Sequence, residues 1–151
     1  MDFLVSLIIL NMDKVVIDTN VLVAALRSQH GASHQLLLEL TSDWFKPAVS
    51  VPLFLEYEAV LKRPGLIPNL VPADIDNVLN YLLTKAQLCQ IYYLWRPCLK
   101  DPQDDMVLEL AVQSQSQFIV TFNVRDFKRS ATFGIKPITP QQLLERKRRL
   151  K

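Results

Sequence analysis

The sequence predicts an α/β fold in which a central parallel sheet carries helices on both faces. The run at residues 14–17 (Lys-Val-Val-Ile) continues directly into Asp18, and apolar residues at helical spacing follow it. An unbroken apolar run is typical of a strand that is buried on both faces, as in a parallel sheet. Residues 118–122 form a second such run. Strand-like segments that alternate with helical segments indicate an α/β architecture.

Apolar periodicity and the positions of Pro, Gly and capping residues predict the remaining elements. The predicted helices are one after Asp18 with Thr19 or Asn20 as its cap, then helices over residues 32–43, 51–63 and 72–87, one that follows the acidic loop 100–105, and one that begins at Thr139. The other predicted strands cover residues 44–50, 88–95 and 135–138.

Single residues support several of these elements. Ser50 can cap the third helix, and Pro52 suits its first turn. Pro137 confines the last strand to the rim of the sheet, because proline cannot donate to a hydrogen-bond ladder. On the fourth helix, Val78 and its apolar neighbours are expected to face the core.

The chain of 151 residues fits one domain with a substantial core. We expect this domain to span residues 14–145, after an extension over residues 1–13 and before a basic tail over residues 146–151. The apolar start is too short to span a bilayer, so no membrane association is expected; it is an upstream extension, an extra strand or an arm. The tail carries five of the seventeen Lys and Arg. It can contact nucleic acid or form a solvated helix end, and the sequence leaves both open.

Cysteine and histidine show no disulfide framework and no zinc site. Cys89 and Cys98 lack metal-ligand spacing, so we expect reduced thiols in a cytoplasmic protein. His30 and His34 lie four residues apart but have no third ligand nearby.

Acidic residues follow or open several predicted elements. Asp18 follows the first strand, Glu56 lies on the third helix, and Asp126 follows the strand that begins at Phe118. Ligand crevices of parallel α/β sheets lie at the carboxyl ends of the strands, so these side chains can converge. A further acidic cluster before the fifth helix comprises Asp101, Asp104 and Asp105.

Several carboxylates without a committed Cys or His make an oxygen-rich site that suits Mg²⁺ or Mn²⁺. Like charges raise one another's pKa, and a divalent ion relieves this repulsion while it activates water and stabilises charge on a phosphoryl oxygen. Each acid also has a structural interpretation. Asp104 and Asp105 suit a helix start, Asp101 a turn, Asp126 a cap and Glu56 a solvated helix face. Their shared position at the ends of successive elements favours a site.

Four sequence motifs, taken in order, carry a family resemblance. They are Val-Val-Ile-Asp18-Thr19-Asn20, Leu-Phe-Leu-Glu56-Tyr57-Glu-Ala-Val-Leu-Lys-Arg-Pro, Asp101-Pro-Gln-Asp104-Asp105 and Val-Thr121-Phe-Asn123-Val-Arg-Asp126-Phe. In this order the motifs resemble those of PIN-domain ribonucleases, particularly the VapC-like toxin components of bacterial toxin–antitoxin pairs. The resemblance covers residues 14 to about 145.

The resemblance implies a PIN-like fold and endoribonuclease activity that depends on one or two Mg²⁺ or Mn²⁺ ions. It implies metal contact by Asp18, Glu56 and Asp104, with Asp126 as a substitute fourth acid because Asn123 stands where many relatives carry an acid. Side chains implied in supporting roles are Thr19 and Asn20, expected to orient Asp18, together with Asp101, Asp105, Thr121 and Asn123. The implied partners are an RNA substrate, a cognate antitoxin protein and a second copy of the chain in a homodimer.

Two other function classes are compatible with an acidic α/β domain. One is a catalytically weak or inactive module that binds RNA or a protein partner. The other is a divalent-metal phosphatase, which would carry a second acid two residues after its aspartate nucleophile. Asn20 stands at that position after Asp18, which counts against the phosphatase. Metal-dependent hydrolysis of RNA discriminates the nuclease from the binding module.

Overall fold

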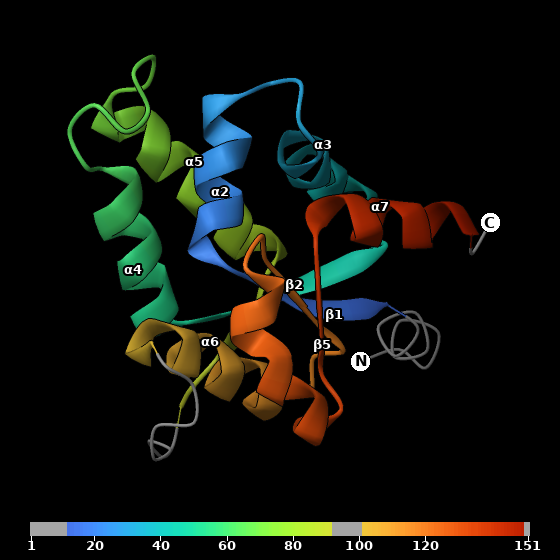
Figure 1. The fold of residues 1–151 in the computed structure, drawn as a ribbon. Coiled ribbons are helices and arrows are strands. Elements are labelled where there is room, and N and C mark those ends of the chain that lie inside the picture. The colour runs from blue at the N-terminus through green and yellow to red at the C-terminus, as the bar shows by residue number, and fades with distance from the viewer. Residues whose placement is uncertain (1–11, 92–100, 150–151) are drawn as a thin grey trace.

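The computed structural model describes residues 12–91 and 101–149, which form a five-stranded parallel sheet with helices on both faces (Figure 1). The strands are β1 (Asp13–Ile17), β2 (Phe45–Ser50), β3 (Gln87–Cys89), β4 (Phe118–Val120) and β5 (Lys136–Ile138). The α-helices are α2 (Thr19–Arg27), α3 (Ala32–Leu38), α4 (Val51–Leu61), α5 (Pro72–Lys85), α6 (Pro102–Gln113) and α7 (Pro140–Arg149), and the 3-10 helices are η1 (Glu39–Ser42) and η2 (Val124–Phe133). The predicted α/β fold is confirmed.

The strand order β3-β2-β1-β4-β5 defines where a ligand crevice can form. From β1 the chain builds outward through β2 and β3, and it then crosses to the other side of β1 for β4 and β5. The carboxyl ends of β1 and β4 flank this switch point, the usual place for a site in an open parallel sheet. Ile17 pairs with Val120, and the backbone N–H of Asp18 donates to the carbonyl of Val120 at 2.9 Å. Asp18 and Thr121 therefore lie side by side at this edge.

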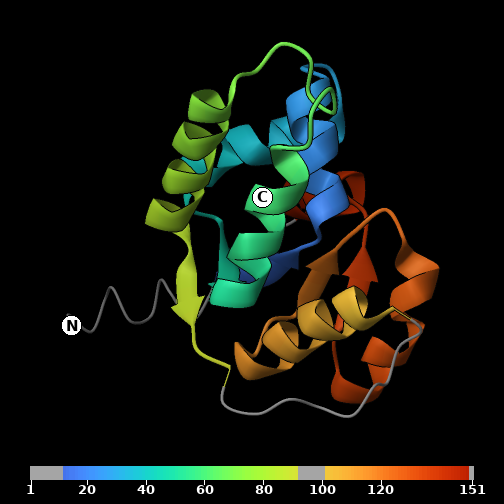
Figure 2. The same ribbon diagram turned by 90° about the vertical axis from the view of Figure 1, so that its left-hand side faces the viewer.

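Two layers of helices cover the sheet. Figures 1 and 2 show α6 and η2 on one face, and α2, α3 and α7 on the other. Val15, Val16 and Ile119 are completely buried in the central strands. Burial on both faces explains why the β1 sequence is apolar without alternation. None of the helices in the described ranges is long and apolar enough to cross a membrane.

Several predicted boundaries are confirmed. The Ser50 hydroxyl accepts a hydrogen bond from the backbone N–H of Leu53 at 3.3 Å and caps α4. Pro137 lies in β5, which is an edge strand. The strand predicted over residues 88–95 is found as β3, but β3 ends at Cys89, so Gln90 and Ile91 are not part of it, and residues 92–95 lie outside the described ranges. Residues 1–11 and Cys98 also lie outside them, as does Lys151 of the tail.

Three predictions about helices are wrong. The N-cap of α2 is Asp18, because Thr19 and Asn20 already lie in the first helical turn. The helix predicted over residues 32–43 ends as an α-helix at Leu38 and continues as η1. Val78 is only half-buried, because α5 presents Ile75 to the core and leaves Val78 in a surface groove.

Candidate active site

Asp18 is held in one orientation at the carboxyl end of β1. Its side chain is 8% exposed, and its Oδ2 accepts a hydrogen bond from the Thr121 hydroxyl at 2.7 Å. The same hydroxyl accepts from the backbone N–H of Asn123 at 2.9 Å. Because that N–H occupies an acceptor position of the hydroxyl, the hydroxyl proton of Thr121 is directed at Asp18. Thr121 is therefore the side chain that orients this carboxylate.

Thr19 orients a different carboxylate from the one expected. Its hydroxyl donates to Oε2 of Glu56 at 2.7 Å and so connects the first turn of α2 with α4. Thr19 contacts Asp18 through its backbone, which donates a hydrogen bond to the Asp18 carboxylate, whereas its side chain points toward α4. The buried Oδ1 of Asn20 has no hydrogen-bond donor within the described residues.

Tyr57 supports the site from behind and was not singled out from the sequence as a functional residue. It is fully buried, and its hydroxyl donates to the backbone carbonyl of Ile17, the residue before Asp18. Burial raises its pKa far above 10, and the charges of Asp18 and Glu56 raise it further, so the hydroxyl stays protonated. The available signal was a tyrosine in the apolar stripe of α4, since a buried hydroxyl requires a partner.

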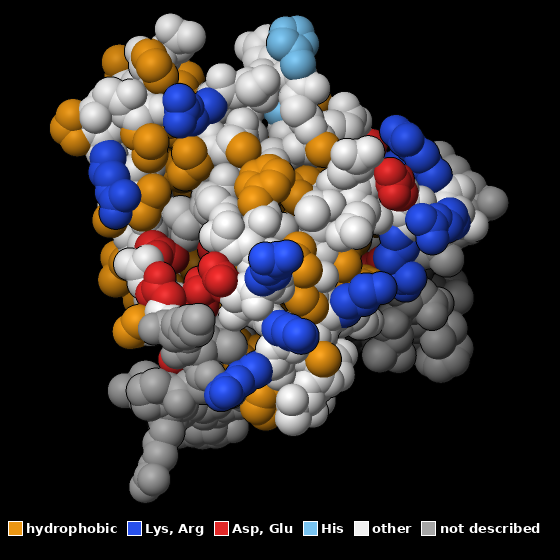
Figure 3. Space-filling view, viewed as in Figure 1, with side chains coloured by type: hydrophobic (Ala, Val, Ile, Leu, Met, Phe, Trp, Pro, Cys, Tyr) orange, Lys and Arg blue, Asp and Glu red, His pale blue; other side chains and the backbone are white. Residues whose placement is uncertain are grey.

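A cavity of about 360 Å³ opens at this edge of the sheet. Figure 3 shows a group of acidic side chains on this side of the molecule. The charged and amide side chains that line the cavity are Asp18, Asn20, Glu56, Arg63, Asp101, Gln103, Asp104 and Asn123. Asp105 and Asp126 are not among the lining residues, and Asp126 is exposed on η2. Asp101 also caps α6, because its Oδ1 accepts from the backbone N–H of Gln103 at 2.9 Å.

The carboxylates repel one another. Burial raises the pKa of Asp18, the charges of Glu56 and Asp101 raise it further, and hydrogen bonds from the Thr121 hydroxyl and the Thr19 backbone oppose this change. The pKa of Asp104 rises to about 6, chiefly through burial and then through the charges of Asp18, Asp101, Asp126 and Glu56. Asp126 thus acts on the site electrostatically although it does not line the cavity. The sequence-predicted acids other than Asp105 form one electrostatic unit.

The residues present fit a divalent cation in their chemistry. The donors are hard carboxylate and amide oxygens, and the unpartnered Oδ1 of Asn20 offers one more. Burial is the main cause of the raised pKa of Asp104, and a cation would relieve the charge repulsion that adds to it. Within residues 12–91 and 101–149, no three His, Cys, Asp or Glu side chains are close enough together to hold a metal ion. Asp18, Glu56 and Asp104 line the cavity from three separate elements.

Comparison with known proteins decides the family. The family model of the PIN domain matches residues 14–125. The chain belongs to the PIN domain family. The match includes Asp18, Glu56, Asp104 and Thr121 but ends one residue before Asp126. The acids that line the cavity therefore lie within the matched residues, whereas Asp126 lies outside them.

A solved structure supports the same fold. The PIN domain is similar to a chain in the crystal structure of VapBC2 from Rickettsia felis bound to a DNA fragment from their promoter, with a TM-score of 0.57. The two chains are 17% identical, and the similarity covers 83% of this chain and 98% of the other. At this identity the similarity shows the fold. No curated protein sequence matches the chain.

Proposed function

We propose that this PIN domain, comprising residues 14–145, is a Mg²⁺- or Mn²⁺-dependent endoribonuclease that hydrolyses RNA phosphodiesters. The observation that carries the proposal is the set of mutually repelling carboxylates around one cavity at the switch point of the sheet. Such repulsion is costly to a fold unless a cation offsets it, and a cation at a cavity of this kind suits phosphodiester hydrolysis.

Each carboxylate has a defined role in the proposal. Asp18, Glu56 and Asp104 hold the ion, and Asp126 supplies additional negative charge as the fourth acid. The bound ion supplies a Lewis acid and a water of lowered pKa. Thr121 and Thr19 fix Asp18 and Glu56 through their 2.7 Å hydrogen bonds, so that neither carboxylate has to be ordered when the ion and the RNA bind.

We further propose that the nuclease is the toxin of a toxin–antitoxin pair, that it forms a homodimer, and that a cognate antitoxin protein controls it. The similarity to VapBC2, whose structure contains promoter DNA, supports an antitoxin partner. The same proposal includes one or two Mg²⁺ or Mn²⁺ ions and a cytoplasmic location.

Cleavage of a panel of structured and single-stranded RNAs tests the proposal. Purified protein, freed of any co-expressed partner, is assayed with Mg²⁺, Mn²⁺ or EDTA beside the Asp18→Ala variant. We expect cleavage with either ion, none with EDTA, and none by the variant. Equal cleavage by wild type and variant would reveal a contaminating nuclease. RNA binding by a folded wild type that cuts no RNA in the panel would overturn the nuclease in favour of a binding module.

A further inference from the structure

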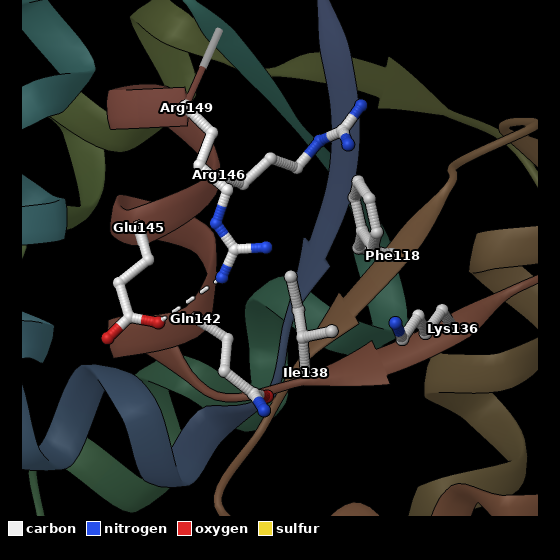
Figure 4. A pocket seen from close by; sticks show the side chains of 7 residues that line it. All are labelled: Phe118, Lys136, Ile138, Gln142, Glu145, Arg146 and Arg149. Carbon is white, nitrogen blue, oxygen red and sulfur yellow. Dashed lines mark ion pairs between the residues drawn. The ribbon is translucent and has the colours of Figure 1, made fainter.

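A second cavity, of about 260 Å³, lies between α7 and the strands β4 and β5 (Figure 4). Its charged lining residues are Lys136, Glu145, Arg146 and Arg149, and Phe118 contributes an aromatic wall. Positive side chains thus outnumber negative ones in the lining. We call this cavity the α7 cleft. The proposed function does not use it, although it contains part of the basic tail predicted from the sequence.

Arg146 is committed to the fold. Its guanidinium donates to both carboxylate oxygens of Asp13, at 2.8 and 3.2 Å, and lies 5.0 Å from the centre of the Phe118 ring. A two-pronged pair with a buried aspartate fixes the guanidinium plane. Arg146 therefore forms a rigid wall of the cleft and links α7 to the start of β1.

Two other cations of the α7 cleft are available to a ligand. Lys136 is exposed, and it makes no ion pair within the described residues. Arg149 is 81% exposed, and its contact with Glu145 is 3.9 Å long. An exposed pair of this length contributes little to stability, so a phosphate oxygen can replace Glu145 without a large loss.

The α7 cleft is one end of a longer basic band. Figure 3 shows Lys and Arg side chains in a band from over η2 to over α7, with the acidic group next to its η2 end. On η2, Arg125 and Lys128 are exposed and make no ion pair within the described ranges. Phe118 of the cleft precedes Thr121 of the acidic site by three strand residues, or about 10 Å. An extended chain that follows the basic band over the surface can therefore contact both (Figure 3).

We propose that the α7 cleft binds the phosphodiester backbone of single-stranded RNA that extends from the acidic site. The inference rests on the proposed function, because it assigns a substrate path to that site. Cations spaced along a band match the repeated charge of a nucleic-acid strand. A cleft with an aromatic wall suits a single strand, whereas duplex readers place a helix or ribbon into a groove. Lys136 and Arg149 are the phosphate-binding residues.

RNA affinity at several salt concentrations tests the α7 cleft. Fluorescence anisotropy of a labelled single-stranded RNA is measured with the full chain carrying Asp18→Ala, in EDTA, so that cleavage does not contribute. The test variant adds Lys136→Gln and Arg149→Gln. The control adds Arg27→Glu, which removes the same net charge at the exposed far end of α2. A third protein carries Lys136→Arg and Arg149→Lys.

We expect the test variant to bind RNA about tenfold more weakly at low salt. The slope of log affinity against log salt should also become less steep by about 1.4, because each of the two lost phosphate contacts contributes about 0.7 to it. The control and the charge-conserving variant should keep the parent slope. Equal slopes in test and control variants would overturn the proposal. A duplex DNA of the same length is titrated as a second probe, and a loss of affinity confined to that duplex would also overturn the proposal. If the wild-type protein cleaves RNA but the test and control variants have equal slopes, only the RNA-binding role of the α7 cleft is refuted. If the slope of the test variant changes but the wild-type protein cleaves no RNA, only the nuclease activity is refuted.

Discussion

Asp13 and Asp18 stand at opposite ends of the same strand and are equally buried, each 8% exposed. Asp13 faces a guanidinium, because Arg146 of α7 donates to both of its carboxylate oxygens. Asp18 faces a hydroxyl and further acids, and burial raises its pKa. The same residue type at the same burial therefore has two functions. Asp13 joins the last helix to the sheet, whereas Asp18 makes no ion pair within the described residues.

A second pair of acids shows the same contrast. Glu39 accepts hydrogen bonds from Lys147 at 2.7 Å and from the indole N–H of Trp44 at 2.9 Å, and these partners lower its pKa to about 2. Asp104 is partly buried and has acids around it, and these raise its pKa to about 6. Acids on the α7 side stabilise the fold through cations, whereas acids at the switch point carry a repulsion suited to a bound ion.

The largest expected effect is on the rate of RNA cleavage, which should depend on Asp18 but not on Asp13. Asp18→Asn should lower the rate of RNA cleavage by about 10³-fold, because it removes charge that holds the ion. Asp13→Asn should leave the rate of the folded protein within about twofold of wild type, as its carboxylate only contacts Arg146. Single-turnover cleavage with Mg²⁺, at a temperature where both variants are folded, measures this. An equal loss in the two variants would remove the distinction.

The next effect concerns pH. The folded, metal-free protein holds the Asp104 proton more tightly than the unfolded chain, since the pKa of about 6 exceeds the usual 3.8. This contribution to stability is present at low pH and is lost as the pH rises through about 6. Because an ion must displace that proton, Mg²⁺ should raise the Tm more at about pH 7.5 than at about pH 5. At 100 times its Kd the ion would add about 2.7 kcal/mol.

Differential scanning fluorimetry with and without Mg²⁺ measures this pH effect. Asp104→Asn should abolish the difference between the two pH values, while Asp13→Asn should preserve it. A Mg²⁺-induced rise in Tm that is the same at both pH values in wild type would show that proton displacement at Asp104 does not accompany ion binding.

A smaller effect is expected on stability, where the substitution of Asp13 should cost more than the substitution of Asp18. In EDTA, Asp13→Asn should lower the free energy of unfolding by about 1–2 kcal/mol, because it weakens a charge-assisted pair with Arg146. Asp18→Asn should leave that free energy unchanged or raise it, because the amide oxygen still accepts from Thr121 while the repulsion falls. Urea denaturation compares the variants. Greater destabilisation by Asp18→Asn than by Asp13→Asn would contradict this assignment.

The smallest effect probes the support behind Asp18. Tyr57→Phe removes the hydroxyl that donates to the Ile17 carbonyl and should cost about 1 kcal/mol of stability. Tyr81→Phe is the matched control, because Tyr81 is 37% exposed. Urea denaturation of both variants provides the comparison. Similar stabilities would show that the hydroxyl of Tyr57 does not support β1.

Local sequence patterns predicted the fold because the determining interactions are local or periodic. The apolar run of β1, the cap at Ser50 and Pro137 at the edge each follow from a few neighbouring residues. The end of α3 was mispredicted because Glu39 and its neighbours retain helical composition while η1 leads to Asp43 in a left-handed conformation, with φ of 53°. Intrinsic preference does not encode that change of geometry.

The candidate site could be predicted only in part. The convergence of Asp18 and Asp104 is predictable because each follows a strand or opens a helix, and carboxyl ends of parallel strands share one edge, where Glu56 can enter from the neighbouring helix. Their hydrogen-bond partners depend on register between distant elements. Thr121 lies 103 residues from Asp18, and Arg146 lies 133 residues from Asp13. No local pattern indicates which hydroxyl or guanidinium reaches which carboxylate.

Binding of Mn²⁺ to the metal-free protein tests the central distinction most directly, and isothermal titration calorimetry measures it without an RNA substrate. We predict saturable binding to wild type and to Asp13→Asn, and binding weaker by tenfold or more in Asp18→Asn and Asp104→Asn, because those carboxylates hold the ion. Equal Mn²⁺ affinity in wild type, Asp18→Asn and Asp104→Asn would contradict the account, since the repelling acids would then not form the ion site.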